Sequence, residues 1–562
     1  MNILGIGGYS HDSAAALVCD GQLVAAVAEE RLTRVKHQGG VPRKAVQFCL
    51  DTAGITRDEV DHICCYMRPG RRLMSRIPYR LGKMFRAPSY SAGYIGYEIL
   101  HNARYIAEMR SLRGKKTRLH FMEHHPAHAA SSFLVSPFSS AALLSIDYVG
   151  EWASTWAGLG ADSTITREWS ANYPNSLGVL YTAITDYLGF ARASDEYKVM
   201  GLASYGEPEF AQDFRWIVRR GLLGQYHIDM SWLQCHYLPG SRRGYMSHKF
   251  IKRFGPPRKR DEPIEARHRN IAASLQTVLE ETVLYTAESV HNATGQSRLC
   301  LAGGVALNCS MNGRLLREGP FEEIFVQPAA GDDGIAIGAA FQKYYALAGK
   351  PREFEMQHAY WGPEFSNNAI KHFLDLAKLP YESPANVVER TADLLAEGKI
   401  VGWYQGRMEF GPRALGSRSI LADPTRADMK DLINKYVKHR EEFRPFAPSC
   451  LEERATEYFE GCTKSPFMLF VYRVKPEMRE RVPAITHVDG TARVQTVNKV
   501  SNPRFYAVIE AFEKRRGVPM VLNTSFNVMG EPIVHTPADA VRCFYSTGMD
   551  ALVMGDHVLL KN

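Results

Sequence analysis

The sequence has few cysteines, no long apolar run and no strong bias in composition. Its 562 residues include 10 scattered cysteines and no CxxC pair, so we expect free thiols in a reducing compartment and no disulfide framework. No apolar run reaches the roughly 18 residues of a membrane-spanning helix. The opening segment, MNILGIGGYSHDS, has no basic region of the kind that begins a signal peptide. These absences predict a cytoplasmic protein with no membrane partner.

The positive net charge is confined to two stretches. A composition of 45% hydrophobic and 23% charged residues excludes a disordered or fibrous chain. The formal charge of +8, taken alone, favours a nucleic-acid partner. However, 15 of the 68 Lys and Arg residues lie in the segments 68–86 and 239–260, which contain no acid, and the rest of the chain has more acids than bases. The two basic stretches therefore need an explanation of their own.

Short apolar strands that alternate with glycine turns and helices predict an α/β fold. Residues 2–8 are expected to form a buried strand, and residues 13–19 and 22–28 a β-hairpin. A second strand-and-hairpin pattern at 141–160 indicates an internally duplicated fold. Further along, a long helix is followed by two strand–glycine–helix units, as in doubly wound α/β proteins.

We expect two domains joined by a connector. Residues 351–385 contain several prolines, and we interpret them as the connector between a domain at 1–350 and a domain at 386–562. The second domain is expected to open with a helix at 386–397. Its further strands are expected near 401, 468–475, 492–498, 519–523 and 551–560.

A candidate metal site combines two histidines and two acids. His124 and His128 are four residues apart, so on a helix they share one face, whereas His125 points elsewhere. Asp147 ends an apolar strand, where an uncompensated carboxylate is costly, and Asp332 lies at a strand–helix junction. Two imidazoles and two carboxylates suit an Fe, Mn, Zn or Mg ion and leave coordination positions for phosphate oxygens. The alternative is that the histidines are caps or satisfied polar groups.

Two glycine-containing loops are candidate nucleotide contacts. In LAGGVALNCSMN, Gly303 and Gly304 follow a strand and precede a helix, which lets a phosphate approach backbone N–H groups. The loop that contains Gly331 has the same architecture, and we expect the two loops to face each other across a cleft. A plain tight turn is the more common explanation of such a glycine pair.

Two further motifs are less specific. His11, in YSHDSAAAL, is a candidate general base for a hydroxyl group, because imidazole titrates near neutral pH. A turn histidine bonded to backbone is the alternative. Lys198, in SDEYKVMGLASYG, stands beside a glycine-containing turn, a pattern that is uninformative by itself.

The second domain carries arginines next to glycines and hydroxyl groups. Such arginines suit a phosphate-rich ligand, with a solvated charged face as the alternative. The candidate residues are Arg407, Arg413, Arg418, Lys438, Arg440, Arg444, Arg493, Asn523, Ser525 and Asn527.

At these motifs the chain resembles the O-carbamoyltransferase family, which includes nodulation carbamoyltransferases and the carbamoylating enzymes of antibiotic biosynthesis. The resemblance covers almost the whole chain and implies a Kae1-like domain of the actin-like ATPase fold followed by a YrdC-like domain. It rests on ten segments in family order: SHDSAAALV, EERLTRVKH, EHHPAHAAS, SLGVLYTAIT, EYKVMGLASYG, LAGGVALNC, GDDGIAIGAA, GRMEFGPRALGSRSILADP, REEFRPFAP and LNTSFNVMGEPIV.

The resemblance implies an ATP-dependent reaction in two steps. In the family, the YrdC-like domain converts carbamoyl phosphate and ATP to carbamoyl adenylate, and the Kae1-like domain transfers the carbamoyl group to a hydroxyl group while AMP leaves. A divalent metal is implied, Fe²⁺ first, with Mn²⁺, Zn²⁺ or Mg²⁺ as alternatives. The expected acceptor is a small molecule, a natural product or a sugar, with no nucleic acid; a homodimer is left open.

The resemblance also assigns residues. His124, His128, Asp147 and Asp332 match the metal ligands, and His11 matches the histidine that deprotonates the acceptor. The residues that match the nucleotide pocket of the Kae1-like domain are Lys36, Lys198, Gly303, Gly304, Asn308 and Gly331. The residues that match or neighbour the phosphate contacts of the YrdC-like domain are Arg413, Arg418, Lys438, Arg440, Arg444, Arg493, Asn523 and Ser525.

Two other functions remain open at this point. An enzyme of the tRNA threonylcarbamoyl-adenylate pathway shares both domain types. A nucleic-acid or membrane-surface binding protein would use the two basic stretches without turnover. The order of the domains and the segment GRMEFGPRALG favour the small-molecule enzyme. Because the stretches 68–86 and 239–260 belong to none of the ten segments, we expect them to shape the acceptor entrance or a subunit contact.

Overall fold

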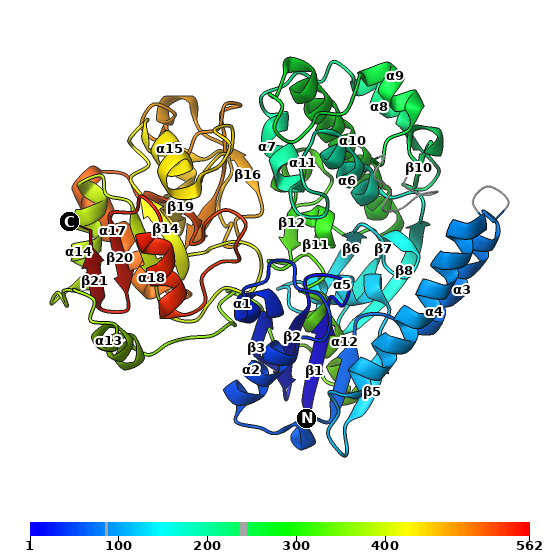
Figure 1. The fold of residues 1–562 in the computed structure, drawn as a ribbon, viewed down its shortest axis with the longest axis horizontal. Coiled ribbons are helices and arrows are strands. Elements are labelled where there is room, and N and C mark those ends of the chain that lie inside the picture. Colours follow the sequence, from blue (N-terminus) through cyan, green and yellow to red (C-terminus); the bar gives the residue numbers. More distant parts are fainter. Residues whose placement is uncertain (85–87, 235–243, 562) are drawn as a thin grey trace. The chain divides into compact units, whose positions relative to one another are not determined.

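The computed structural model describes residues 1–84, 88–234 and 244–561. The chain divides into two compact units (Figure 1). The first unit contains Met1–Glu29 and His37–Glu355, and the second contains Glu30–Lys36 and Met356–Asn562. In the described part of the chain, no helix is both long and apolar enough to cross a membrane.

The first sheet of the first unit has five strands in the order β3-β2-β1-β4-β5. β1 runs antiparallel to β2, β2 runs antiparallel to β3, and β4 and β5 continue on the other side of β1 in parallel. The predicted strand and hairpin are confirmed. The strands are β1 (Asn2–Gly7), β2 (Ala14–Cys19), β3 (Gln22–Ala28), β4 (His62–Cys65) and β5 (Arg118–Phe121).

The second sheet repeats this pattern in the order β12-β11-β6-β7-β8. β6 has two successive antiparallel strands on one side and two parallel strands on the other, as β1 does in the first sheet. The predicted α/β fold class is confirmed. The strands are β6 (Ser140–Ile146), β7 (Ala153–Ala161), β8 (Thr164–Asn172), β11 (Arg298–Ala302) and β12 (Glu323–Val326).

Helices α5 (His124–Phe133) and α12 (Ile335–Ala348) pack closely against each other and against strands of the two sheets. The contact requires glycine. A Cβ atom on Gly338 of α12 would lie 1.9 Å from the carbonyl oxygen of Ala127 in α5, and one on Gly5 of β1 would lie 1.8 Å from that of Ala336. The small residues of the segment IAIGAA thus bring the N-terminal ends of α5 and α12 together.

Further helices surround these sheets. The predicted helix near 264–291 is confirmed as α10, a helix of 29 residues. The other elements of this part are α2 (Arg43–Ala53), α6 (Leu177–Tyr187), α7 (Glu196–Ala203), α8 (Ala211–Ile217), β9 (Val218–Arg220), β10 (Tyr226–Ile228), α10 (Ala266–Thr294) and α11 (Cys309–Glu318).

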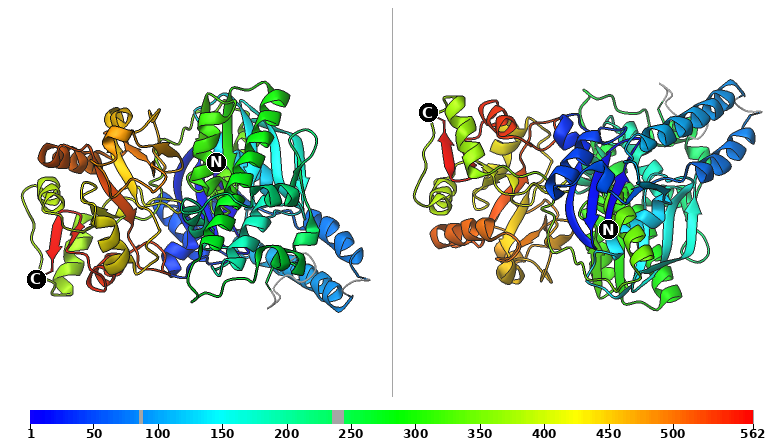
Figure 2. Two further views of the ribbon diagram at one scale, coloured as in Figure 1. Left: turned by 90° about the horizontal axis from the view of Figure 1, so that it is seen from above. Right: turned by 90° about the horizontal axis from the view of Figure 1, so that it is seen from below.

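The basic stretch 68–86, of which 85–87 lie outside the described residues, forms helix α3 (Pro69–Leu81). α3 lies beside α4 (Pro88–Arg110), and the pair extends away from the sheets of its unit (Figures 1 and 2). Arg72 and Arg76 of α3 form ion pairs with the buried Glu98 of α4, at 2.6 and 3.0 Å. Two of the seven positive charges of this stretch therefore share one buried carboxylate inside the helix pair.

The second basic stretch, 239–260, is described from residue 244 onward and contains α9 (His248–Phe254). Arg253 forms an ion pair with Asp213 at 2.7 Å. The buried Arg258 donates a hydrogen bond to the carbonyl oxygen of Leu188 at 2.7 Å. These two arginines hold the segment against its own unit.

The second unit is built on a seven-stranded mixed sheet in the order β18-β15-β19-β14-β13-β20-β21. Helices α14 and α17 pack together, and a core that includes Trp403 and Phe505 lies beneath them. The strands are β13 (Val401–Tyr404), β14 (Arg418–Ala422), β15 (Ala447–Leu451), β18 (Gln495–Val497), β19 (Met520–Ser525), β20 (Ala551–Met554) and β21 (His557–Leu560). The other elements are α13 (Asn367–Leu376), α14 (Val387–Ala396), α15 (Met429–Leu432), α16 (Ala455–Tyr458), α17 (Pro503–Arg516), α18 (Pro537–Tyr545) and the pair β16 (Val471–Arg473) and β17 (Thr491–Arg493).

The second unit also includes residues 30–36, which the sequence analysis placed in the first domain. Arg31 donates a hydrogen bond to the carbonyl oxygen of Gly411 at 3.0 Å, and Arg34 donates one to that of Pro532 at 2.8 Å. Arg34 also forms an ion pair with Asp539 at 3.5 Å. The segment expected as a connector, 351–385, contains helix α13.

Candidate functional site

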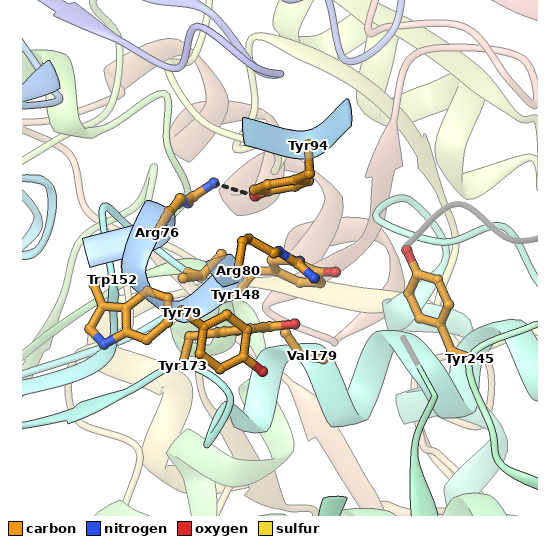
Figure 3. A pocket seen from close by; sticks show the side chains of 10 residues that line it. Arg76, Tyr79, Arg80, Tyr94, Tyr148, Trp152, Tyr173, Val179 and Tyr245 are labelled. Atoms are coloured by element: carbon orange, nitrogen blue, oxygen red, sulfur yellow. Dashed lines mark hydrogen bonds between the residues drawn. The ribbon is translucent and has the colours of Figure 1, made fainter. Parts of the chain in front are cut away.

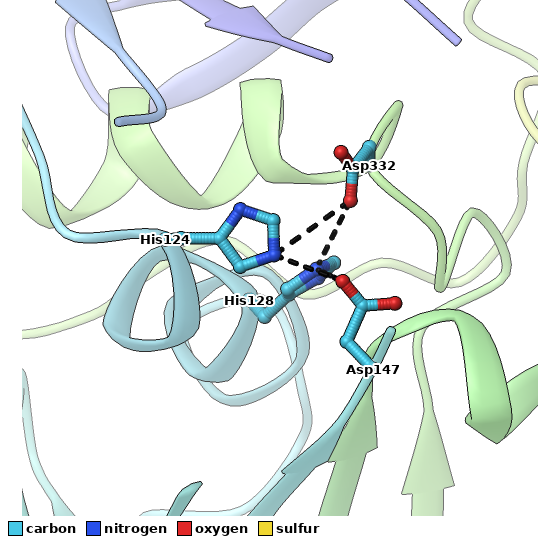
Figure 4. A group of neighbouring side chains, drawn as sticks. All are labelled: His124, His128, Asp147 and Asp332. Carbon is cyan, nitrogen blue, oxygen red and sulfur yellow. Dashed lines mark hydrogen bonds and ion pairs between the residues drawn. The ribbon is translucent and has the colours of Figure 1, made fainter. Parts of the chain in front are cut away.

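The structure brings the four predicted metal ligands together in the first unit (Figure 4). His124 and His128 lie one turn apart near the start of α5. Asp147 directly follows β6, and Asp332 lies in the loop before α12. One potential ligand atom from each residue lies within 4.8 Å of those of the other three.

The distances within this cluster fit a shared ion. His124 Nε2 lies 3.0 Å from Asp147 Oδ2 and 3.7 Å from Asp332 Oδ1. His128 Nε2 lies 3.7 and 3.5 Å from the same two oxygens. Ligand atoms about 2 Å from one metal ion lie ~3–4 Å from one another. The donor set of two imidazoles and two carboxylates suits a divalent ion.

His128 supplies an independent reason to expect a ligand. Its side chain is fully buried, and neither ring nitrogen has a hydrogen-bond partner within the protein. Such an unsatisfied buried group is costly, and a metal ion would satisfy Nε2. Burial disfavours the charged imidazole, but Asp147 and Asp332 outweigh this and raise the pKa of His128 to about 9. Burial also disfavours the charged carboxylate of Asp147, but the two histidines hold its pKa well below the usual range.

His125 points away from this cluster, as predicted. Its Nδ1 lies 2.9 Å from the hydroxyl oxygen of Ser145, and its Nε2 lies 2.9 Å from the carbonyl oxygen of Ala153. Both ring nitrogens are therefore satisfied by protein, and burial lowers the pKa of His125 to about 3. The side chain is a neutral structural group.

The two glycine loops converge on the metal cluster. The N–H of Gly304 donates a hydrogen bond to Asp147 Oδ1 at 3.0 Å. Gly303 has φ +89°, and a Cβ there would lie 2.2 Å from the carbonyl oxygen of Ile146. The loop of Gly331 carries Asp332, the fourth member of the cluster. The first loop thus holds Asp147 in place, while the second contributes Asp332 to the cluster.

Asn308 caps helix α11. Its side-chain oxygen accepts a hydrogen bond from the N–H of Met311 at 3.0 Å. The same side chain exchanges two hydrogen bonds with Gln276, at 2.9 and 3.0 Å. Asn308 therefore fixes the start of the helix that follows the glycine pair. A nucleotide contact would have to use the hydrogen-bonding capacity of the Asn308 side chain that these bonds leave over.

His11 lies in a small network with an acid and a second histidine. Its Nδ1 is 2.9 Å from Asp12 Oδ2, and Nδ1 of His37 is 2.8 Å from Asp12 Oδ1. Nε2 of His37 lies 3.1 Å from the hydroxyl oxygen of Ser194. Burial disfavours the charged form of His11, but Asp12, Asp332 and Asp147 outweigh this and raise its pKa to about 10. Because Asp147 and Asp332 contribute to this rise, a cation held between them would favour the neutral imidazole.

The two predicted lysines differ in their surroundings. Lys198 is buried on α7 and forms an ion pair with Asp195 at 3.2 Å. Lys36 lies in the segment 30–36 that groups with the second unit.

In the second unit, Lys438 lies at the centre of a polar group. It ends a short π-helical turn, Ile433–Lys438, and its ammonium donates to the carbonyl oxygen of Ser525 and to Asn527 Oδ1, the latter at 2.9 Å. Ser525 donates its hydroxyl to Asn527 Oδ1 at 2.8 Å. Burial, with the charges of Arg440 and Arg444, holds the pKa of Lys438 well below the usual range.

Two other predicted contacts are buried within the second unit. Arg418 has no exposed surface; its guanidinium lies 3.7 Å from the Tyr404 ring centroid and donates to the carbonyl oxygen of Gln405 at 2.6 Å. Asn523 donates to the hydroxyl of Ser449 at 2.9 Å. Both side chains hold strands and loops in place beneath the predicted site.

Four more arginines remain candidates for anion contacts. Arg440 donates from Nε to Asn434 Oδ1 at 2.7 Å, and Arg444 lies 3.8 Å from Glu441. Arg413 and Arg493 are partly exposed.

Comparison with known proteins identifies the family. Residues 2–341 match the family described as Carbamoyltransferase N-terminus, and residues 392–561 match the one described as Carbamoyltransferase C-terminus. The chain belongs to the carbamoyltransferase family. The predicted resemblance and the predicted enzyme class are thereby confirmed.

Relatives of this carbamoyltransferase cover most of the chain. Nodulation protein NolNO of Sinorhizobium fredii is 41% identical over 98% of this chain and 79% of its own length. Nodulation protein NolO of Bradyrhizobium diazoefficiens is 43% identical over 78% of this chain and 79% of its own length. Uncharacterized protein sll1178 of Synechocystis sp. is 44% identical over the whole of this chain and 97% of its own length.

The sequence analysis of this carbamoyltransferase missed Asp12 and His37. Asp12 bridges His11 and His37 from a backbone with φ +50°, a conformation that few residues other than glycine adopt. The only sequence signal was the acid directly after His11, which matches the common pairing of a histidine with an orienting carboxylate. His37 comes from a separate segment and carried no signal.

Proposed function

We propose that this protein is an ATP-dependent O-carbamoyltransferase that forms carbamoyl adenylate in the second unit and transfers its carbamoyl group to a hydroxyl in the first. One observation carries the proposal. In a chain that matches both carbamoyltransferase family halves, His124, His128, Asp147 and Asp332 converge within 4.8 Å, and the ring nitrogens of the buried His128 form no hydrogen bond.

In the first step, carbamoyl phosphate, ATP and one water molecule give carbamoyl adenylate, and phosphate and pyrophosphate are released. Both substrates are anions, so their site needs fixed cationic donors. Lys438 meets this need, because it is buried and already oriented by Ser525 and Asn527. Arg440 and Arg444 lie close enough to influence its charge. Arg413 and Arg493 are the further anion contacts in this proposal.

In the second step, the acceptor hydroxyl oxygen bonds to the carbonyl carbon of carbamoyl adenylate. The bond from that carbon to the phosphate oxygen breaks, AMP leaves, and the hydroxyl proton passes to His11. Asp12 orients the imidazole from Nδ1, which leaves Nε2 for the proton. This is the usual division of work between a base and its orienting carboxylate.

The metal cluster serves the leaving group in this proposal. His124, His128, Asp147 and Asp332 would hold a divalent ion, Fe²⁺ first, with Mn²⁺, Zn²⁺ or Mg²⁺ as alternatives. When bound, such an ion supplies a positive charge that holds phosphate oxygens and offsets the charge of the departing AMP. Gly303, Gly304, Asn308, Gly331 and Lys198 are the proposed nucleotide contacts of the first unit. Lys36, which groups with the second unit, is also a proposed nucleotide contact.

We further propose that the first unit is a duplicated, Kae1-like domain of the actin-like ATPase fold and that the second unit is YrdC-like. The duplication is supported by the strand pattern that the two five-stranded sheets of the first unit share. The acceptor is proposed to be a small molecule in the cytoplasm. The tRNA-pathway alternative finds less support, because Arg72, Arg76 and Arg253 of the two basic stretches are engaged in ion pairs.

The test is a reaction with purified protein, ATP, carbamoyl phosphate and a divalent metal. We expect AMP release that depends on carbamoyl phosphate, and a mass gain of one carbamoyl group on hydroxylated acceptors. ATP consumption that is indifferent to carbamoyl phosphate would contradict the proposal. Replacing small acceptors by tRNA in the same assay tests the alternative.

A further inference from the structure

The first unit contains a cavity of about 130 Å³ beside the metal centre, with six aromatic side chains in its wall (Figure 3). We call it the aromatic pocket. It is formed by helices α3 and α4, the loop after β6 and the start of α6. Helix α3, part of the basic stretch that no motif explained, thus lines a pocket. The aromatic side chains are Tyr79, Tyr94, Tyr148, Trp152, Tyr173 and Tyr245.

One loop touches both the aromatic pocket and the metal centre. Tyr148, in the pocket wall, directly follows the ligand Asp147. At Gly150 the loop passes so close to His124 that a Cβ would lie 2.8 Å from the imidazole Cδ2. From the other direction, Arg76 donates hydrogen bonds to the carbonyl oxygens of Gly150 and Glu151 at 2.8 and 2.9 Å. A molecule in the pocket would therefore lie next to the residues that position the metal ligands.

The wall suits a ring with apolar faces and a polar edge. The rings of Tyr79, Trp152 and Tyr173 contact one another edge to face, with centroids 5.1–5.7 Å apart. All three are partly exposed, so they present ring surface. Tyrosine and tryptophan in this setting bury an apolar surface while their polar ends form hydrogen bonds. Hydroxylated ring compounds such as sugars have that pattern.

The charge of the wall restricts the ligand further. Arg80 is 4% exposed, and its guanidinium carbon lies 4.2 Å from the ring centroid of Tyr94. Arg76 also lines the pocket, and it shares the carboxylate of Glu98 with Arg72. An aromatic cage alone attracts cations, but here an arginine of the protein already stacks on the ring. A ligand ammonium would meet like charges, which interfaces use to reject wrong partners.

We propose that the aromatic pocket binds the acceptor of the carbamoyl-transfer reaction and selects neutral or anionic hydroxylated ring compounds against amines. This inference rests on the proposed function, because it names the acceptor class of that same reaction. The pocket would present one hydroxyl group of the ring toward the loop of Tyr148, and thus toward the metal centre. Arg80 acts as the specificity-determining residue.

The experiment uses the full-length protein and three probes with one ring: the methyl glycosides of glucose, glucosamine and glucuronic acid. Binding is measured by calorimetry at about pH 6.5, where the amine is protonated. We expect the glucoside and the glucuronide to bind about tenfold or more tightly than the glucosaminide. Arg80→Gln should reduce the difference in affinity between the glucosaminide and the other two glycosides. Arg71→Gln, on the same helix, paired with Glu123 and 44% exposed, is the matched control and should preserve it.

The same preparations are assayed for carbamoyl adenylate formation, which does not depend on the aromatic pocket. Equal or tighter binding of the glucosaminide, an unchanged preference in Arg80→Gln, or no binding of any probe would overturn the pocket assignment. Trp152→Phe, which keeps an aromatic ring and removes the indole N–H, guards against a misfolded Arg80 variant, since it should weaken glycoside binding without altering the charge preference. Absence of carbamoyl-phosphate-dependent adenylate in the wild type would instead refute the proposed function.

Discussion

The backbone N–H of Gly304 and the imidazole of His124 contact opposite oxygens of one carboxylate, that of Asp147, each at 3.0 Å. The glycine loop and the histidine helix are thereby joined through a single side chain. Such partners fix the orientation of a metal ligand, and their loss commonly weakens metal binding. A phosphate bound at the glycine loop and an ion bound at the histidines would each alter the position of the same carboxylate.

The first prediction concerns Asp332, whose Oδ1 lies 3.5 Å from Nε2 of His128. Asp332→Asn removes one charged ligand, so divalent metal should bind about 100-fold more weakly, since even changes outside the ligand set cost 10–100-fold. Carbamoyl transfer should fall while adenylate formation persists. Metal affinity is measured by titration calorimetry. Asp333→Asn, in the same loop and outside the cluster, is the control, and equal metal affinities of the two variants would contradict the ligand assignment.

The second prediction concerns the pH dependence of transfer. The carboxylate of Asp12 helps to raise the pKa of His11 to about 10, so the imidazole gains its proton-accepting form only as the pH rises toward that value. Asp12→Asn removes the negative charge, lowers the pKa of His11 and moves the rising limb of the pH–rate profile to lower pH. The maximal rate should fall, because the imidazole loses its orienting partner. Single turnovers of preformed carbamoyl adenylate measure this step.

If the rising limb of the pH–rate profile stays at the same pH in Asp12→Asn, His11 is not the general base. Asp162→Asn, an exposed residue in the turn after β7, serves as the control and should leave the profile unchanged. Added divalent metal should also move the rising limb of the wild-type pH–rate profile to lower pH, because Asp147 and Asp332 contribute to the raised pKa of His11.

The third prediction concerns Arg34, which joins a segment near the N-terminus to the second unit. Its guanidinium donates to the carbonyl oxygen of Pro532 and pairs with Asp539. Arg34→Ala leaves these partly buried groups without their donor and should lower the free energy of unfolding by about 1–3 kcal/mol. Because Ser525 and Asn527 precede this loop, the KM for carbamoyl phosphate should rise as well. Thermal unfolding and adenylate assays measure the two effects.

Arg542→Ala is the matched control for Arg34. Arg542 also pairs with Asp539, at 3.6 Å, but its side chain is 57% exposed. Exposed ion pairs contribute about 0–1 kcal/mol, so this variant should remain close to wild type. Equal destabilisation by both substitutions would show that only the charge of Asp539 matters and that the docked segment contributes little.

The sequence could predict the four-residue cluster because each candidate ligand ends or begins a recognisable element. His124 and His128 share a helix face, and Asp147 and Asp332 follow strands of the same sheet. It could not distinguish a partly exposed arginine from a buried one. Arg418 stands beside glycine and hydroxyl residues as the partly exposed Arg413 does, yet its guanidinium is enclosed by Tyr404 and backbone carbonyls. Whether an arginine is buried depends on packing between residues far apart in the chain, which the local sequence pattern does not indicate.

The segment 30–36 and the Asp12 network were missed for a related reason. Arg34 binds residues about 500 positions away in the chain, and no periodicity in EERLTRVKH indicates it. Asp12 depends on a left-handed backbone conformation that sequence assigns by default to glycine. The strand pattern, by contrast, follows directly from apolar runs and turns, so the hairpin β2–β3 was predictable.

The last prediction concerns Lys438. Burial and the neighbouring Arg440 and Arg444 hold its pKa well below the usual range, so its charged form is disfavoured in the free enzyme. A bound phosphate or carbamoyl phosphate places negative charge beside it and raises that pKa, so binding should take up protons. Calorimetric titration with carbamoyl phosphate in buffers of different ionisation enthalpy measures the uptake. Lys438→Met should abolish it and slow adenylate formation by about 10²–10³-fold, the cost of losing one electrostatic donor.

Lys435→Met provides the comparison for Lys438. Lys435 lies in the same π-helical turn, Ile433–Lys438, but its side chain is exposed. This variant should keep both the proton uptake and the rate of adenylate formation. Lys438→Met should still transfer the carbamoyl group from supplied carbamoyl adenylate, because that step belongs to the first unit. If proton uptake persists in Lys438→Met, another group takes up the proton. Lys438 would then serve only as a structural donor to Ser525 and Asn527.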